Sequence, residues 1–118
     1  MNILKKTILL VEDQILSAAP AIKFLKKAGY DIIYVLSGEK AVSVIEAGIH
    51  VDLIVMDIDL GLGICGITAS IKINLINKIP ILFFTNHSEQ YIKEKLGNSI
   101  SMNYLTKKNP YTSLIKSI

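Results

Sequence analysis

The sequence contains no arginine and no tryptophan, and it has a single cysteine among its 118 residues. One cysteine excludes an internal disulfide framework and a cysteine-rich zinc site. All 13 basic residues are lysines, so the chain lacks the bidentate fork with which arginine reads guanine edges and phosphates. Aromatic residues make up only 7%, which disfavours a stacking platform for single strands. We therefore expect no direct nucleic-acid binding by this chain.

Long hydrophobic runs are also missing, although hydrophobic residues make up 51% of the chain and its mean hydropathy is +0.46. Unbroken apolar runs such as residues 81–84 are far shorter than the ~20 residues of a membrane-spanning helix. The first ten residues lack the apolar region and the cleavage site of a secretory signal. We expect no membrane association and a cytoplasmic location.

Short apolar runs alternate with amphipathic segments along the whole chain. The continuous runs are typical of strands buried on both faces, and they lie at residues 7–11, 32–36, 53–56, 81–84 and 101–106. Helical spacing follows each run, with segments beginning near residues 15, 37, 66, 88 and 110. Pro20 lies inside the first of these helices, where it predicts a kink or a delayed start. In the third helix, Ile67, Ile71 and Leu75 are predicted to share one side.

Five alternations of strand and helix predict an α/β fold with a parallel sheet and helices on both faces. Right-handed crossovers leave few topologies, and the flavodoxin-like (βα)5 doubly wound sheet with strand order 2-1-3-4-5 is the one we expect. The length fits one domain, residues 1–118. The last helix is short and its apolar face stops in mid-turn, so we expect the chain to be cut from a longer protein with an output or kinase portion.

Polar residues follow four of the predicted strands. Glu12 and Asp13 follow the first strand, Asp57 the third, Thr85 the fourth and Lys107 the fifth. Ligands of an open parallel sheet bind outside the carboxyl ends of its strands, so these side chains should converge there. Each of them alone has an ordinary structural explanation as a helix cap, a turn residue or a surface lysine. Their common position favours a site.

In this order and spacing the chain resembles the receiver domain of bacterial two-component response regulators. The resemblance rests on four segments at the ends of predicted strands, namely residues 8–13, 53–58, 80–85 and 104–107. It implies that Asp57 is the phosphoacceptor. It also implies a Mg²⁺ site, for which Mn²⁺ could substitute, with Asp13 and Asp57 as direct ligands, Glu12 acting mainly through water and Asp59 contributing its backbone carbonyl.

The resemblance further implies how a signal leaves the site. Lys107 would bind one phosphoryl oxygen, and Thr85 would hydrogen-bond another. The movement of Thr85 would let Tyr104 turn inward and remodel the surface formed by the fourth helix, the fifth strand and the fifth helix. The implied partners are a sensor histidine kinase or phosphotransfer domain and a downstream output domain or partner protein, with homodimerisation left open. The chain would be a signalling switch and not an enzyme, apart from weak self-phosphorylation and self-dephosphorylation.

The chain also departs from the pattern of receivers. Cys65 stands where an acidic residue is frequent, and Asn86 is bulkier than the small residue common there. Receivers usually have a proline directly after the active-site lysine, whereas Lys108 and Asn109 separate Lys107 from Pro110 here, which makes Lys108 a minor rival for the role of Lys107. Asp59 and His87 stand at positions that flank the attacking water in receivers. These departures leave open a receiver-like module that works by protein contact without phosphate. A haloacid-dehalogenase-like phosphatase is a weaker alternative, suggested by the paired aspartates Asp57 and Asp59.

Overall fold

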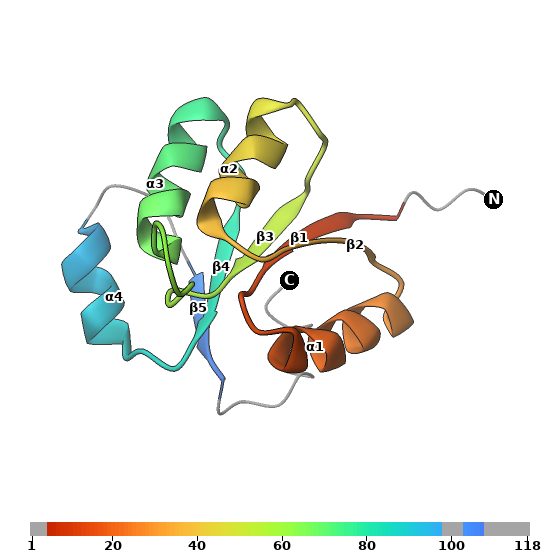
Figure 1. Cartoon of the computed structure of the whole chain (residues 1–118), viewed down its shortest axis with the longest axis horizontal. Coiled ribbons are helices and arrows are strands. Elements are labelled where there is room, and N and C mark those ends of the chain that lie inside the picture. Colours follow the sequence, from red (N-terminus) through yellow and green to blue (C-terminus); the bar gives the residue numbers. More distant parts are fainter. Residues whose placement is uncertain (1–4, 98–102, 108–118) are drawn as a thin grey trace.

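A single parallel sheet organises the computed structural model, which describes residues 5–97 and 103–107. Its strands lie in the order β2-β1-β3-β4-β5 (Figure 1), which confirms the predicted fold class and strand order. The helix predicted from Pro110 onward lies outside the described residues. In chain order the elements are β1 (Thr7–Val11), α1 (Ile15–Lys27), β2 (Asp31–Val35), α2 (Gly38–Glu46), β3 (Leu53–Met56), α3 (Gly66–Ile76), β4 (Ile81–Thr85), α4 (Glu89–Leu96) and β5 (Asn103–Thr106).

Helices cover both faces of the sheet, so its central strands are buried on each side. α1 lies on one face, while α2, α3 and α4 lie on the other (Figure 1). Alternate strand residues face opposite ways. The face toward α2, α3 and α4 carries Leu9, Val11, Ile54, Met56, Ile81 and Phe83. The face toward α1 carries Ile8, Leu10, Val55, Leu82 and Phe84. Two apolar cores, one on each face, therefore hold the sheet.

Helix α1 continues through its proline. The predicted delay is wrong, because the helix begins at Ile15 and runs to Lys27 with Pro20 inside it. Proline lacks an N–H, so the carbonyl of Leu16 loses its usual helical partner. Leu16 is 91% exposed, which lets water reach this turn of the helix. The proline thus lies at a turn where water can replace the missing hydrogen bond.

Helix α3 buries a different set of residues from the predicted one. Ile67 is buried and Ile71 packs against the core, as predicted, but Leu75 is 82% exposed. The buried side of α3 is wide near its start, where Gly66, Ala69 and Ser70 let it pack closely on the sheet and on α2. Farther along α3, Ile73 is the last buried residue, and the final turn of the helix lies beyond the region that packs on the sheet.

Serine side chains cap the starts of α2 and α4, which begin close to the predicted residues 37 and 88. The Ser37 hydroxyl accepts a hydrogen bond from the Lys40 N–H at 3.1 Å, and the Ser88 hydroxyl accepts one from the Tyr91 N–H at 3.2 Å. Each bond satisfies a backbone donor that the first helical turn leaves free. Within the described part of the chain, no helix combines the length and the hydrophobicity needed to cross a membrane.

Candidate functional site at the carboxyl edge of the sheet

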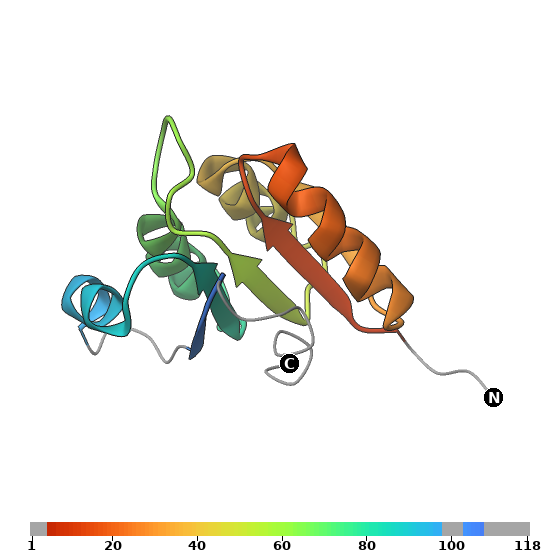
Figure 2. The ribbon, with the colours of Figure 1, turned by 90° about the horizontal axis from the view of Figure 1, so that it is seen from below.

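The carboxyl ends of β1, β3, β4 and β5 meet at one edge of the sheet. In Figure 2, β1 and β3 point toward the edge where α1 begins and the loop after β3 lies. Glu12 and Asp13 follow β1, Asp57 follows β3, and Lys107 follows β5. Carboxylate oxygens of the three acids lie within 4.8 Å of one another. The predicted convergence of these acids is therefore present in the structure.

Lys107 connects two of these carboxylates. Its Nζ donates to Asp57 Oδ2 at 2.8 Å and to Glu12 Oε1 at 3.0 Å. Its own backbone N–H donates to the carbonyl of Thr85 at 2.9 Å, which attaches the residue to the end of β4. The two carboxylates and partial burial act on the ammonium in opposite directions, and the net effect is to raise the pKa of Lys107. The lysine is therefore a fixed cation at the centre of the site.

Glu12 is the most deeply buried acid of the site, with 5% of its surface exposed. Burial, followed by the neighbouring carboxylate of Asp57, raises its pKa to about 7, although Lys107 opposes the change. Its Oε2 is buried and has no hydrogen-bond partner among the described residues. A buried carboxylate oxygen without a partner is costly, so a proton or a cation would stabilise this atom.

Asp57 is held at both carboxylate oxygens. Its Oδ1 accepts a hydrogen bond from the Ile58 N–H at 2.7 Å, and its Oδ2 accepts the bond from Lys107. Its backbone N–H donates to the carbonyl of Val11 at 3.0 Å, which continues the pairing of β3 with β1. At Gly66, the first residue of α3, an added Cβ would collide with the carbonyl of Asp57. The backbone around this carboxylate is therefore tightly packed.

Thr85 ends β4 with its side chain almost fully buried. Its Oγ1 accepts a hydrogen bond from the backbone N–H of His87 at 3.2 Å. Tyr104 pairs with Phe83 in the register of β5 with β4, and its side chain lies outside the described part of the structure. The predicted roles of Thr85 and Tyr104 in a switch stay predictions.

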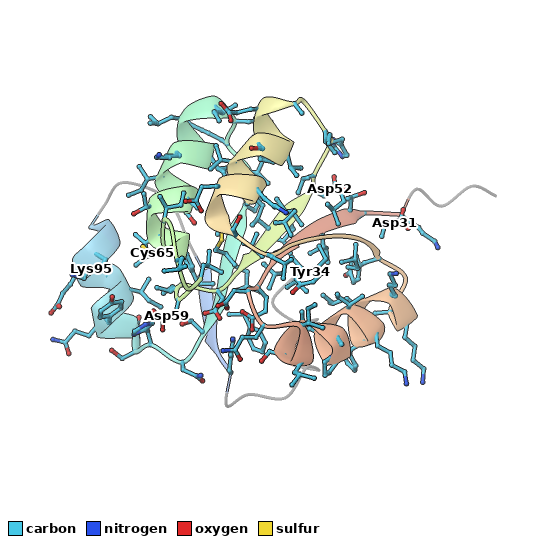
Figure 3. The ribbon with its side chains drawn as sticks, viewed as in Figure 1. Asp31, Tyr34, Asp52, Asp59, Cys65 and Lys95 are labelled. Carbon is cyan, nitrogen blue, oxygen red and sulfur yellow. The ribbon has the colours of Figure 1, made fainter. Side chains whose placement is uncertain are left out.

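A pairing that the sequence did not reveal connects the loops after β3 and β4. His87 Nε2 lies 2.9 Å from Asp59 Oδ2, although the two residues are 28 positions apart. The His87 ring also stacks on the ring of Tyr91 in α4, with centroids 4.1 Å apart and 12° between the planes. Lys95 Nζ lies 5.6 Å from the centre of the Tyr91 ring. Figure 3 shows Asp59 at this side of the site, near α4, with its side chain mostly exposed.

The loop between β3 and α3 is shaped by two glycines and one glutamate. Gly61 and Gly63 have φ of +70° and +92°, a region that suits glycine. An added Cβ at Gly61 would come 3.1 Å from Asp13 Oδ2, and one at Gly63 would collide with the carboxylate of Glu39. Glu39 Oε2 accepts a hydrogen bond from the Ile64 N–H at 2.9 Å. The start of α2 therefore holds this loop close to Asp13.

Comparison with known protein families decides which family this is. Residues 8–118 match the response regulator receiver domain. The chain belongs to this family. The match covers nearly the whole sequence, and it confirms the resemblance seen in the residues at the strand ends. Receiver domains are generally signalling switches that interact with histidine kinases and output domains.

Solved structures of other receiver domains resemble this one closely. The N-terminal domain of a response regulator/sensory box/GGDEF three-domain protein from Carboxydothermus hydrogenoformans is 37% identical, with a TM-score of 0.86, and the match covers 94% of this chain and 89% of that one. A receiver protein from Sinorhizobium medicae is 23% identical, with a TM-score of 0.87 and coverage of 97% and 91%. The Vibrio cholerae chemotaxis protein CheY4 is 20% identical, with a TM-score of 0.86 and coverage of 97% and 96%. The last two likenesses concern the fold.

Receiver domains generally bind Mg²⁺ in an acidic pocket, and the residues at this edge suit that ion. Mg²⁺ prefers carboxylate oxygens and keeps several of its waters. Glu12, Asp13 and Asp57 supply carboxylate oxygens within 4.8 Å of one another. The buried Oε2 of Glu12 is the one that lacks a partner in the described part of the chain, and a cation or its water would satisfy it. The donor set of this receiver domain therefore fits the expected ion.

One contact of this receiver site was not expected from the sequence. The hydroxyl of Tyr34, on β2, donates to the backbone carbonyl of Glu12 at 2.8 Å. A tyrosine among the apolar residues that end β2 is the signal that could have pointed to it. A cavity of about 230 Å³ lies nearby on the α1 side of the sheet and reaches Glu12, Asp57 and Lys107. The site is thus bordered by β2 and α1 as well as by its own loops.

Proposed function

We propose that this receiver domain accepts a phosphoryl group on Asp57 in the presence of Mg²⁺ and passes the change on through Thr85 and Tyr104. The observation that supports this most is the double contact of Lys107 Nζ, at 2.8 Å from Asp57 and 3.0 Å from Glu12. Phosphoryl transfer depends mainly on positioning and on neutralising charge. A fixed ammonium beside one carboxylate of an acid cluster provides both.

In the proposed reaction, a carboxylate oxygen of Asp57 attacks the phosphorus of a phosphohistidine on a kinase or phosphotransfer domain. The new O–P bond forms as the N–P bond breaks, and the imidazole leaves with the electron pair and takes up a proton from water. Lys107 stays beside the phosphoryl group and binds one of its oxygens. Bound Mg²⁺ would supply further neutralisation of the phosphoryl charge. Asp13 and Asp57 would hold the ion directly, Glu12 mainly through water, and Asp59 by its backbone carbonyl.

The paired aspartates Asp57 and Asp59 do not favour a phosphatase of the haloacid-dehalogenase type. Such an enzyme uses the second carboxylate next to the first. Here the Asp59 carboxylate is 76% exposed and contacts His87. The match to receiver domains also argues for a switch. A module that works without phosphate remains the alternative that the experiment must exclude.

The test is the intact mass of the protein after incubation with Mg²⁺ and acetyl phosphate. We expect one added phosphoryl group, because the acyl phosphate can transfer it to Asp57 with release of acetate. The adduct should be absent without Mg²⁺ and in Asp57→Asn, and hydroxylamine should remove it. Asp31→Asn is the matched control, since Asp31 begins β2 at the opposite edge and is exposed. The proposal would be contradicted if Asp57→Asn gave as much phosphoryl adduct as the wild type. It would also be contradicted if the wild type gave no adduct and beryllofluoride did not shift the amide signal of Thr85.

A further inference from the structure

Tyr34 extends the hydrogen bonding of the sheet by one step beyond the end of β1. The last backbone bond on this side runs from the Glu12 N–H to the carbonyl of Val35 at 3.2 Å. The next acceptor is the carbonyl of Glu12, and the Tyr34 hydroxyl donates to it at 2.8 Å. A side chain therefore takes over where the backbone pairing of β1 with β2 ends. Glu12 is held on this side at both its N–H and its C=O.

The bonded carbonyl belongs to the peptide group that joins Glu12 to Asp13. A peptide group is planar, so fixing its C=O also fixes the direction of its N–H and the orientation of both adjoining Cα atoms. One hydrogen bond therefore bears on both acids that follow β1. From the other side, Gly61 leaves little room around the carboxylate of Asp13, since an added Cβ would lie 3.1 Å from its Oδ2.

From this geometry we infer that Tyr34 is a positioning residue for the cation site, acting through the Glu12–Asp13 peptide. This inference rests on the proposed Mg²⁺ site. The Tyr34 hydroxyl is bonded to the backbone carbonyl of Glu12, so it acts on the two carboxylates through that peptide group. Its part is to hold two carboxylates in place before the ion arrives, which lowers the ordering that binding must otherwise supply.

The surroundings of Tyr34 suit a permanent donor. Tyr34, labelled in Figure 3, packs against the apolar core on the α1 side of the sheet. Ile32 and Leu53 pack against the same core. Burial, and then the charges of Glu12 and Asp13, raise the pKa of the Tyr34 hydroxyl above its ordinary value of 10.0. This direction of change favours the protonated phenol, which is the form that donates the hydrogen bond to Glu12. The ring fixes the position, and the hydroxyl provides the contact.

Removal of the single hydroxyl in Tyr34→Phe tests the inference, because the ring and its packing remain. We expect Tyr34→Phe to raise the Kd for Mg²⁺ by about three- to tenfold, the effect of one lost hydrogen bond. The probe is MgCl₂ alone, titrated into the full chain and followed by the amide signals of the acidic cluster in NMR spectra. The matched control is Tyr30→Phe, which removes a hydroxyl beside the same core; among the described residues, this hydroxyl makes no hydrogen bond to the site. Its Kd should equal that of the wild type.

A second measurement, the NMR amide shifts without Mg²⁺, distinguishes a positioning role of Tyr34 from a general effect on stability. In Mg²⁺-free solution the amide signal of Asp13 should shift in Tyr34→Phe, because its peptide group has lost a hydrogen bond, and it should not shift in Tyr30→Phe. A purely structural role would lower the denaturation midpoint and leave the Kd of the folded protein unchanged. An unchanged Kd in Tyr34→Phe, with the wild type binding Mg²⁺, overturns the inference alone. No saturable binding by the wild type overturns the proposed metal site, and the inference with it.

Discussion

Glu12 is the residue at which the site is electrostatically most demanding. It is buried among acids and shares its one lysine with Asp57. Folding therefore removes this carboxylate from water without fully replacing its interactions, and its pKa rises to about 7. Bound cations relieve this kind of charge crowding. At the scale of single residues, the site is thus prepared for a positive ligand at some cost in stability.

This cost should be visible as a pH dependence of folding in Mg²⁺-free solution. Folding raises the pKa of the Glu12 carboxyl from its ordinary value of 4.5 to about 7. Between these values the folded protein holds one more proton than the unfolded chain, so stability falls as the pH rises through this range. The glutamine of Glu12→Gln carries no charge, so the variant should lose about 2 kcal/mol less stability than the wild type as the pH rises through this range. Thermal denaturation at pH 5 and pH 8 measures it.

The expected result is that Glu12→Gln gains stability over the wild type at pH 8 more than at pH 5. Lys107 does not disturb the comparison, because its raised pKa lies above both pH values. The ammonium also keeps Asp57 as a partner in the variant. An advantage of equal size at the two pH values would show that Glu12 is not the group that titrates.

At the scale of elements, the close contact of α3 with the end of β3 controls the position of the backbone at Asp57. Gly66 begins α3, and its N–H donates to the carbonyl of Ile58 at 2.8 Å. An added Cβ there would collide with the carbonyl of Asp57 and would lie 2.9 Å from Met56 Cγ. The helix can therefore approach this strand only with glycine at its first position.

Gly66→Ala should destabilise the protein by about 3 kcal/mol, since backbone atoms must move to admit the methyl group. Gly48→Ala is the matched control: Gly48 has φ of +77° but no atom within 4 Å of the added Cβ. Its loss should be about 1 kcal/mol, from the backbone conformation alone. Urea denaturation of the two variants gives the comparison. If the two variants lost equal stability, the backbone around Gly66 would have to shift at little cost to admit the methyl group.

Element order and element ends were predictable from the sequence, whereas the contacts between distant segments were not. Continuous apolar runs predicted the strands, and Ser37 predicted the start of α2. Pro20 and Leu75 were misjudged because solvent access and packing, which local patterns do not contain, decide what a helix tolerates. The partnership of Asp59 with His87 depends on how two loops meet. The spacing of residues in the sequence does not indicate that these two loops lie in contact.

At the scale of the whole molecule, the two cores should carry most of the stability. In α3, Ile73 is fully buried against the sheet, while Leu75 lies on the outer surface two residues later. Ile73→Ala should cost about 2–5 kcal/mol, because it leaves a cavity in the core. Leu75→Ala should change stability by less than about 0.5 kcal/mol. Chemical denaturation of the pair tests whether the core residues were correctly assigned, and a costly Leu75→Ala would contradict it.

The candidate site was predictable as a set of residues because parallel strands bring their carboxyl ends to one edge. The strand pattern and the resemblance to receivers were enough to predict that Asp13, Asp57 and Lys107 belong to the site. Tyr34 could not be found in this way, since its contact with Glu12 depends on the register of β2 with β1. The fold thus follows from local patterns, while the finer contacts follow from how whole elements align.

The separation of the site residues along the chain has a consequence for biosynthesis. Lys107 lies 95 residues after Glu12 and 50 residues after Asp57. Translation at about 5–20 residues per second places about 3–10 s between the synthesis of Asp57 and that of Lys107. During that interval the nascent chain has its acids but not the cation that joins them. The ribosome therefore completes the site only after the last strand of the described sheet, and until then Asp57 lacks the ammonium that binds it in the folded protein.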